Sequence, residues 1–183
     1  IVHLLNAESS GGKKEAEGSK MQWRKGEGAT DEDVALTKEA WEKALTVRGP
    51  NGEVPDAVKG MRQFQSDPDN VVYVHAADRT ANVTPNAGHL EVPGAWHAPD
   101  YSQGATISLN PGTLYSTMSS LAHESIHYYR LNTGAFDMFS RRIEETTTTY
   151  YENQFRVYAN NTFPNANYQQ RTTYGNWSVK KWE

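Results

Sequence analysis

The sequence contains no cysteine, which excludes disulfide bridges and zinc sites built on thiolates. It also has no apolar run near the ~18 residues that a transmembrane helix needs, and the apolar stretch at residues 1–5 is too short for a signal peptide. Basic charge is scarce as well: the formal net charge is −4, and no basic stripe carries interleaved aromatic residues. These absences predict a chain without a membrane span whose main partner is not a nucleic acid.

The chain has 183 residues, of which 37% are hydrophobic, and this favours one domain with a sizeable core. Residues 1–29 resemble a linker because they are rich in Gly, Ser, Lys and Glu, although Trp23 interrupts them and is a candidate to dock on the core. Residues 30–183 are predicted to form the single folded domain. Because the chain starts with Ile, we expect it to be a fragment, a processed product or a domain of a larger protein.

The first half of this domain combines helical and extended patterns. Thr30 and Asp33 resemble a capping box, and the apolar residues that follow predict a helix that ends at the turn residues 48–52. Runs of β-branched or alternating residues predict the strands. The other elements expected here are a short helix with Val58, Met61 and Phe64, strands at 71–74 and 105–109, and an irregular segment at 78–104 with a hairpin around Leu90 to Val92.

Two longer helices are predicted in the second half. The first begins at Thr113 and ends at residues 132–134, where Gly134 is a typical helix stop. The second covers about residues 138–159, and the tail after Asn160 is predicted to be mostly irregular. The pattern as a whole predicts an α+β fold in which a small mixed sheet packs on these two helices.

The first of these helices carries an H-E-x-x-H motif, formed by His123, Glu124 and His127. Positions i and i+4 lie one turn apart on one face of a helix, so both imidazoles can reach a single ion. Glu124 then lies beside the ion, where a carboxylate takes a proton from a metal-bound water. The spacing suits tetrahedral zinc, which keeps three protein ligands and one open position in catalytic sites.

The second helix is expected to supply the third ligand, because it carries the adjacent residues Glu144 and Glu145. Side chains of adjacent residues point about 100° apart on a helix, so only one of the two can bind the metal. The other is expected to bond a ligand histidine, and the residues alone leave the choice open. The strand before the motif is expected to line the cleft, with Thr106 to Leu109 as the free edge that pairs with an extended substrate.

The motif, taken with Glu144-Glu145-x-x-Thr148 and Glu152-Asn153-x-x-Arg156, resembles the NleD-like effector peptidases, which are zincins. Similar domains lie at the C-termini of Rhs-type polymorphic toxins. The Glu-Glu-x-x-Thr piece is also similar to the clostridial neurotoxin light chains, in which the first glutamate of the pair binds zinc. The resemblance covers roughly residues 105–174. It implies a zincin-like fold, with Glu144 as the third zinc ligand and Glu145 as a supporting residue.

The resemblance also implies two catalytic residues and a biological role. Arg171 and Tyr174 match an Arg-x-x-Tyr pair that polarises the scissile carbonyl in the neurotoxin light chains, so they are candidate stabilisers of the oxyanion. The biological role implied is that of a secreted effector or toxin domain, delivered into a target or host cell to cleave a specific protein. A cognate immunity protein is a further partner that the toxin resemblance suggests.

The sequence therefore predicts a zinc-dependent endopeptidase. His123, His127 and Glu144 are predicted to hold Zn²⁺, while Glu124 takes the proton of the attacking water and passes it to the leaving amine. The alternative is a non-catalytic binding domain of a larger protein, in which zinc only pins two helices together. Glu124 favours the enzyme, because a purely structural site does not need a general base.

Overall fold

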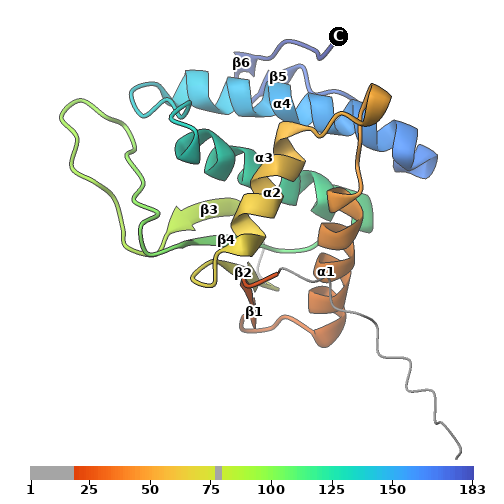
Figure 1. Ribbon diagram of the computed structural model, residues 1–183, viewed down its shortest axis with the longest axis horizontal. Helices are drawn as coiled ribbons and strands as arrows, with labels where there is room; N and C mark the ends of the chain where they lie inside the picture. The colour runs from red at the N-terminus through yellow and green to blue at the C-terminus, as the bar shows by residue number, and fades with distance from the viewer. Residues whose placement is uncertain (1–18, 77–79) are drawn as a thin grey trace, which may run out of the picture.

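A mixed four-stranded sheet and four α-helices form the framework of the described chain (Figure 1). The structure is a computed structural model that describes residues 19–76 and 80–183. Most of the predicted linker lies outside the described residues. The combination of helices with a small mixed sheet confirms the predicted α+β class.

The sheet has the strand order β1-β2-β4-β3. Strands β1, β2 and β4 run parallel to one another, and β3 pairs antiparallel with β4 at one edge. Their bounds are Gln22–Lys25 for β1, Val71–Val74 for β2, Asn82–Pro85 for β3 and Ala105–Leu109 for β4. The two predicted strands, β2 and β4, are confirmed, and both are central and carry fully buried apolar residues.

Two edge strands were not predicted. β1 lies in the segment that resembles a linker, so part of that segment belongs to the sheet, with Trp23 packed against the core. β3 lies in the segment predicted to be irregular, and it covers the outer side of β4. Residues 106–108 are therefore paired on both sides, and the prediction that Thr106 to Leu109 form a free substrate-binding edge is wrong.

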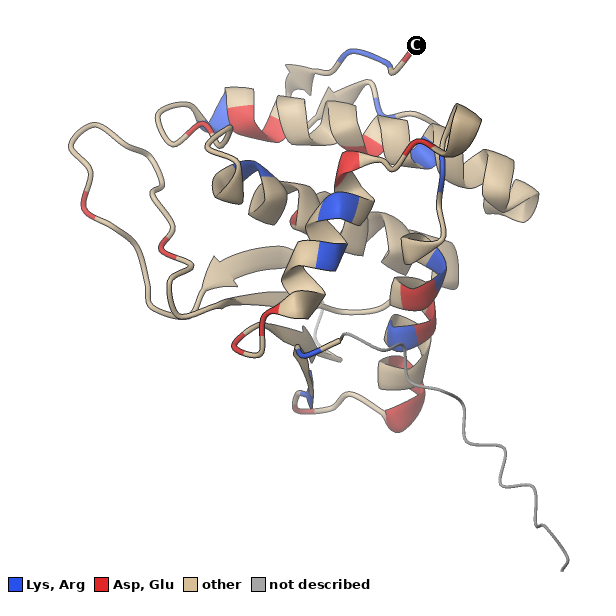
Figure 2. Ribbon diagram, viewed as in Figure 1, with Lys and Arg blue, Asp and Glu red and all other residues tan. Residues whose placement is uncertain are grey.

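The four predicted helices are confirmed, with bounds of Asp31–Leu45 for α1, Asp56–Ser66 for α2, Leu114–Asn132 for α3 and Arg141–Thr162 for α4. Thr30 and Asp33 form the predicted capping box at the start of α1. α3 is the central helix, since α1, α2 and α4 all pack against it. Figure 2 shows acidic and basic residues interspersed along α1, as expected of a helix with one solvated face.

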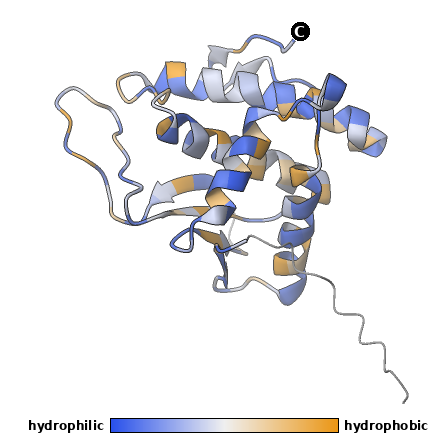
Figure 3. Ribbon diagram, in the orientation of Figure 1, coloured by the Kyte–Doolittle hydropathy of each residue, from blue (hydrophilic) through white to orange (hydrophobic). Residues whose placement is uncertain are grey.

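The hydrophobic core lies between the sheet and helices α1, α2 and α3. Figure 3 shows hydrophobic segments on β4, α2 and α3, which supply much of this core. Phe64, Ile107 and Ile126 are fully buried in it. Gly60 permits the close crossing of α2 over α3, because a Cβ at this position would collide with the backbone carbonyl of Ser125. Packing in this core thus holds the part of α3 that carries the H-E-x-x-H motif in a fixed position relative to α1, α2 and the sheet.

Short elements complete the described chain. The segment between β3 and β4 is closed by a single bridge between His89 and Pro99, so the hairpin predicted around Leu90 to Val92 is not formed as regular strands. The tail contains a small hairpin, β5 at Thr173–Tyr174 and β6 at Trp177–Ser178, packed on α4. Two 3₁₀ turns lie at Pro50–Gly52 and Pro164–Ala166. Within the described ranges, no helix has both the length and the apolar character of a membrane span.

Candidate metal centre

The middle of α3 carries the histidine motif, and all three of its residues are buried. The exposed fractions are 6% for His123, 6% for Glu124 and 8% for His127. The imidazole rings lie one helical turn apart, with their centroids 5.0 Å apart. Both rings face α4, which returns antiparallel to α3 after the turn at residues 133–140. The i, i+4 spacing thus places both imidazoles on one face of α3, as the sequence predicts.

α4 brings Glu145, and not Glu144, to the Nε2 atoms of the two imidazoles. Oε2 of Glu145 lies 3.5 Å from Nε2 of His123 and 3.3 Å from Nε2 of His127. Among the described residues, these three form the one group of His, Cys, Asp or Glu that could hold a metal, with ligand atoms within 4.8 Å of one another. The choice of Glu144 as third ligand is therefore not supported by the geometry, and Glu145 takes its place.

Glu144 is fully buried and its carboxylate is already engaged. It accepts hydrogen bonds from Nδ1 of His127 at 2.9 Å, from the Arg130 guanidinium and from the backbone N–H of Asp137. The hydroxyl of Thr148 also donates to it, at 3.2 Å. Glu144 thus orients His127, which is the supporting role predicted for Glu145.

Nε2 of His123, Nε2 of His127 and Oε2 of Glu145 lie close together, so this group could hold a cation. Glu144 and Glu152 accept from Nδ1 of His127 and His123, so each neutral ring carries its lone pair on Nε2. Oε2 of Glu145 is buried and has no hydrogen-bond partner among the described residues. In a tetrahedral site with bonds of about 2.0–2.1 Å, ligand atoms lie about 3.3 Å apart. Oε2 of Glu145 lies at a similar distance from the two Nε2 atoms, 3.5 Å from that of His123 and 3.3 Å from that of His127. The donor set of two imidazoles and a carboxylate fits zinc.

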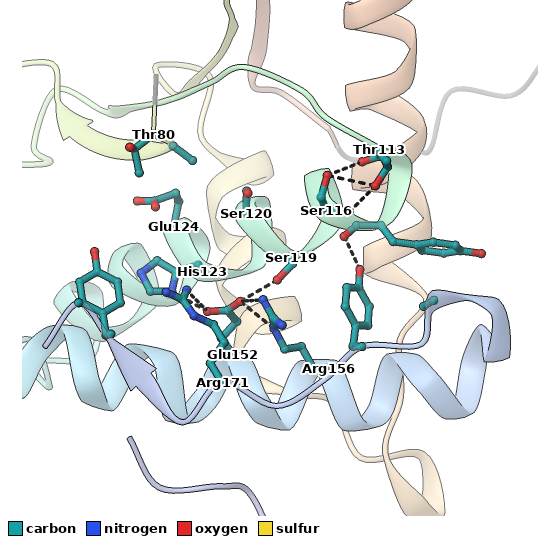
Figure 4. A pocket seen from close by; sticks show the side chains of 16 residues that line it. Thr80, Thr113, Ser116, Ser119, Ser120, His123, Glu124, Glu152, Arg156 and Arg171 are labelled. Atoms are coloured by element: carbon teal, nitrogen blue, oxygen red, sulfur yellow. Dashed lines mark hydrogen bonds and ion pairs between the residues drawn. The ribbon is translucent and has the colours of Figure 1, made fainter. Parts of the chain in front are cut away.

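Glu152 holds His123 at the centre of a second buried network (Figure 4). Its Oε2 lies 3.0 Å from Nδ1 of His123 and accepts from Arg171 at 3.2 Å. Its Oε1 accepts from the hydroxyl of Ser119 at 2.7 Å and from Arg156 at 2.9 Å. Glu152 and Arg156 belong to the motif that carries the resemblance, but no role was predicted for them. Their i, i+4 spacing on α4 was the available signal.

In the absence of a cation, these groups form a network of buried charges. Burial acts to lower the pKa of His123, but interactions with Glu145 and Glu152 outweigh it and raise the pKa to about 10. The same opposition, with Glu144 and Glu145 as partners, raises the pKa of His127. Burial acts to raise the pKa of Glu145, but the two histidines hold it well below its usual range. A cation therefore competes with protons for the two Nε2 atoms.

Glu124 lies beside the candidate metal group, facing the segment that leads into β3 (Figure 4). Burial raises the pKa of its carboxyl group, although the charges of His123 and His127 and the backbone N–H of Val83 oppose the shift. A carboxylate with a raised pKa is a better proton acceptor than an ordinary surface glutamate. The position and the electrostatics of Glu124 thus agree with the role of general base.

Tyr174 and Arg171 reach the site from the C-terminal tail. The Tyr174 ring stacks on His123, with centroids 5.8 Å apart and planes inclined by 5°. Burial and the negative charge of Glu145 raise the pKa of Tyr174 to about 12, so its hydroxyl stays protonated and can donate. The Arg171 guanidinium lies over the Tyr174 ring and donates to Glu152. Arg171 is therefore a positioning residue in this structure, while Tyr174 faces the metal group.

Two cavities meet at the site and form one cleft. Both are lined by His123, Glu124 and Tyr174. The larger cavity, of about 670 Å³, is called the cationic arm because Arg156 and Arg171 line it. The smaller cavity, of about 410 Å³, is called the aromatic arm and is lined by Trp96, Tyr101 and Phe136 together with β3. The edge strand of the cleft is thus β3, not β4.

Comparisons of the chain with protein-family models, with curated proteins and with solved structures gave no match. The functional argument therefore rests on the site itself. The resemblance to NleD-like peptidases and to the neurotoxin light chains stays a prediction.

Proposed function

We propose that this chain is a zinc-dependent endopeptidase of zincin-like architecture. The observation that carries the proposal is the convergence of the lone pairs of His123, His127 and Glu145 beside the buried carboxylate of Glu124, at the junction of two cavities. Zinc would be held by these two histidines and this glutamate. When bound, it would supply Lewis-acid polarisation and lower the pKa of a water molecule.

The chain's own residues then divide the remaining tasks. Glu124 accepts a proton from the attacking water and transfers it to the nitrogen of the leaving amine, for which its raised pKa suits it. Tyr174 donates a hydrogen bond to the oxygen of the substrate carbonyl as negative charge develops there. The free edge of β3 offers backbone groups to an extended peptide. Glu144 and Glu152 keep the two imidazoles in the required tautomer.

The biological role that we propose rests on the resemblance alone. The domain acts on a specific protein inside a target or host cell, after secretion or delivery as part of an effector or toxin. A cognate immunity protein that covers the cleft would be a partner in the toxin case. Specificity lies in the cleft and its loops rather than in the metal site, so the substrate must be found by experiment.

The proposal is tested by metal content and cleavage, with the wild type beside Glu124→Gln. Zinc is measured by elemental analysis, and cleavage by mass spectrometry on a peptide library prepared from a digested proteome. We expect about one zinc per chain in both proteins, and cleavage by Glu124→Gln that is slower by about 10²–10⁴-fold. Glu39→Gln, at an exposed position on α1, is the matched control and should cleave like the wild type.

Two results would contradict the proposal. Equal cleavage by the wild type and Glu124→Gln would remove Glu124 from the mechanism. Stoichiometric zinc with no cleavage of any peptide by the wild type would instead indicate the alternative function, a zinc-stabilised domain that binds a partner.

A further inference from the structure

The cationic arm adjoins the position at which a bond would be cleaved. Thr80, Ala81, His123, Glu124 and Tyr174 line it, and they line the aromatic arm as well. A peptide that passes over Glu124 must therefore place residues in both arms. The volume of about 670 Å³ is large enough for a substrate side chain with its hydration.

The charges that line this arm do not balance away from its junction with the aromatic arm. Apart from His123 and Glu124 at that junction, its ionised groups are Arg156, Arg171 and Glu152. The Glu152 side chain is only 2% exposed, and its two oxygens are taken by the two arginines, Ser119 and His123. One buried carboxylate thus faces two guanidinium groups, which leaves an excess of one positive charge in this part of the cavity wall.

The arginines retain donors that no described residue satisfies. The guanidinium group of Arg171 makes one hydrogen bond within the described chain, through Nη1 to Glu152, and the side chain is 36% exposed. Its Nε and Nη2 donors are therefore available in the cavity. Arg156 is held in place by Glu152 and by the carbonyl of Gln169. Arg156 is thus fixed before a ligand arrives, and Arg171 is oriented by Glu152 and by the Tyr174 ring, which reduces the entropy lost on binding.

Other walls of the cavity favour the same kind of ligand. Ser120 and Thr80 add hydroxyl groups, and α3 begins at this wall with Thr113 and Ser116 (Figure 4). The start of a long helix favours negative charge. A lysine or arginine side chain would be repelled here, and an apolar side chain would remove water from the guanidinium groups without replacing it. An anionic group with two or more oxygens instead matches the fork of an arginine.

We propose that the cationic arm is a specificity subsite that binds an anionic side chain of the substrate peptide, close to the cleaved bond, through Arg171 and Arg156. This inference rests on the proposed peptidase function and adds its substrate class. The ligand is an anionic group with two or more oxygens. It is either the carboxylate of Asp or Glu or the phosphate of a phosphorylated residue. The aromatic arm lacks such a pair of arginines, so the preference is confined to one side of the cleaved bond.

The first test is the cleavage pattern of the wild type on a proteome-derived peptide library, untreated and treated with phosphatase. We expect acidic residues to be enriched at one fixed position within about two residues of the cleaved bond, on one side of it. Enrichment that disappears after phosphatase treatment assigns the subsite to phosphate, and enrichment that persists assigns it to carboxylate. Cleavage without an acidic preference, or removal of single C-terminal residues regardless of side chain, would overturn the inference.

A binding experiment separates this inference from the proposed function. Zinc-loaded Glu124→Gln is immobilised and incubated with the same library, and retained peptides are identified. Retention of acidic peptides supports the subsite even if the wild type cleaves nothing, in which case only the peptidase proposal fails. Retained peptides with no acidic bias overturn the subsite whether or not cleavage occurs.

Substitutions then locate the subsite. For a matched pair of peptides with Glu or Gln at the preferred position, Arg171→Gln should reduce the Glu-over-Gln ratio of kcat/KM by about tenfold or more, because a charge-assisted bond is lost. Arg171→Lys should retain part of the ratio, since the charge remains. Arg142→Gln, at an exposed position on α4 outside both arms, is the control and should leave the ratio unchanged. Zinc content is measured in each variant because Arg171 also contacts Glu152, and an unchanged ratio in zinc-loaded Arg171→Gln would contradict the assignment.

Discussion

Helix α3 separates two buried regions that differ in the chemical character of their side chains. Toward the sheet, α1 and α2, it buries apolar side chains such as Met118, Leu121 and Ile126. Toward α4 the buried residues are largely histidine, glutamate, arginine and hydroxyl-bearing residues. The apolar region stabilises the fold by removing surface from water. Burial of the polar region costs desolvation free energy, so we expect this region to serve ligand binding rather than stability.

The two regions differ in how well they tolerate substitutions. An apolar core accepts side chains of similar volume, because its attraction is not directional. The polar region depends on named pairs, such as Glu144 with Arg130 and Glu152 with His123. Oε2 of Glu145, buried and without a hydrogen-bond partner in the described chain, is the exception that the bound cation would resolve. The predictions below test this division, beginning with the largest effect.

The strongest test is the isosteric pair Glu145→Gln and Glu144→Gln. Glu145→Gln should abolish stoichiometric zinc binding, because an amide is a poor replacement for a ligand carboxylate. Glu144→Gln should retain the site but weaken zinc affinity by about 10–100-fold, because it only supports His127. Zinc content after dialysis measures both. The reverse pattern would restore Glu144 as the ligand.

The apolar region is tested by Phe64→Ala, which should lower the free energy of unfolding by about 3–5 kcal/mol. Phe64 is fully buried in the core, in contact with Trp41 and Tyr128. Phe139→Ala, at a phenylalanine that is 63% exposed, is the control and should change stability by less than about 0.5 kcal/mol. Denaturant unfolding of the zinc-loaded proteins gives the values. A small effect of Phe64→Ala would mean that the two regions are not distinguished by packing.

The role of the phenol at the site is tested by Tyr174→Phe. Loss of the hydrogen bond to the developing oxyanion should reduce kcat by about 10–100-fold, with zinc retained, since the ring still stacks on His123. The control is Tyr150→Phe, on α4 against Trp182 and outside both arms of the cleft. Unchanged turnover by Tyr174→Phe would remove this residue from the mechanism.

The smallest expected effect is the pH dependence of zinc binding. The pKa of His123 without metal is raised from 6.5 to about 10, so protonation of this group stabilises the apo fold fully below pH 6.5 and ceases to do so as the pH rises through 10. Zinc requires the unprotonated Nε2, so binding near pH 7 should release at least about one proton and strengthen about tenfold per pH unit for each proton released. Calorimetric titrations in buffers of different ionisation enthalpy measure this number. Binding without proton release would contradict the charge network described here.

Much of the fold was predictable where the signal is local. The capping box of Thr30 and Asp33 and the stop after Asn132 depend on neighbours in the chain, and α1 and α3 begin and end close to where these signals lie. The short strands β1 and β3 were not predictable in this way. Their residues are polar or partly exposed, and it is pairing with β2 and β4 that makes them strands.

For the site, the sequence by itself determined that two imidazoles share one helix face with Glu124 beside them, because 3.6 residues per turn imposes this on any H-E-x-x-H helix. It also determined that an adjacent pair of glutamates follows on the next helix. Only the tertiary structure decided that Glu145 faces the histidines while Glu144 supports His127. The physical reason is that two adjacent helical residues differ by about 100° in direction, and the rotation of α4 about its axis is set by distant contacts with α3 and the tail.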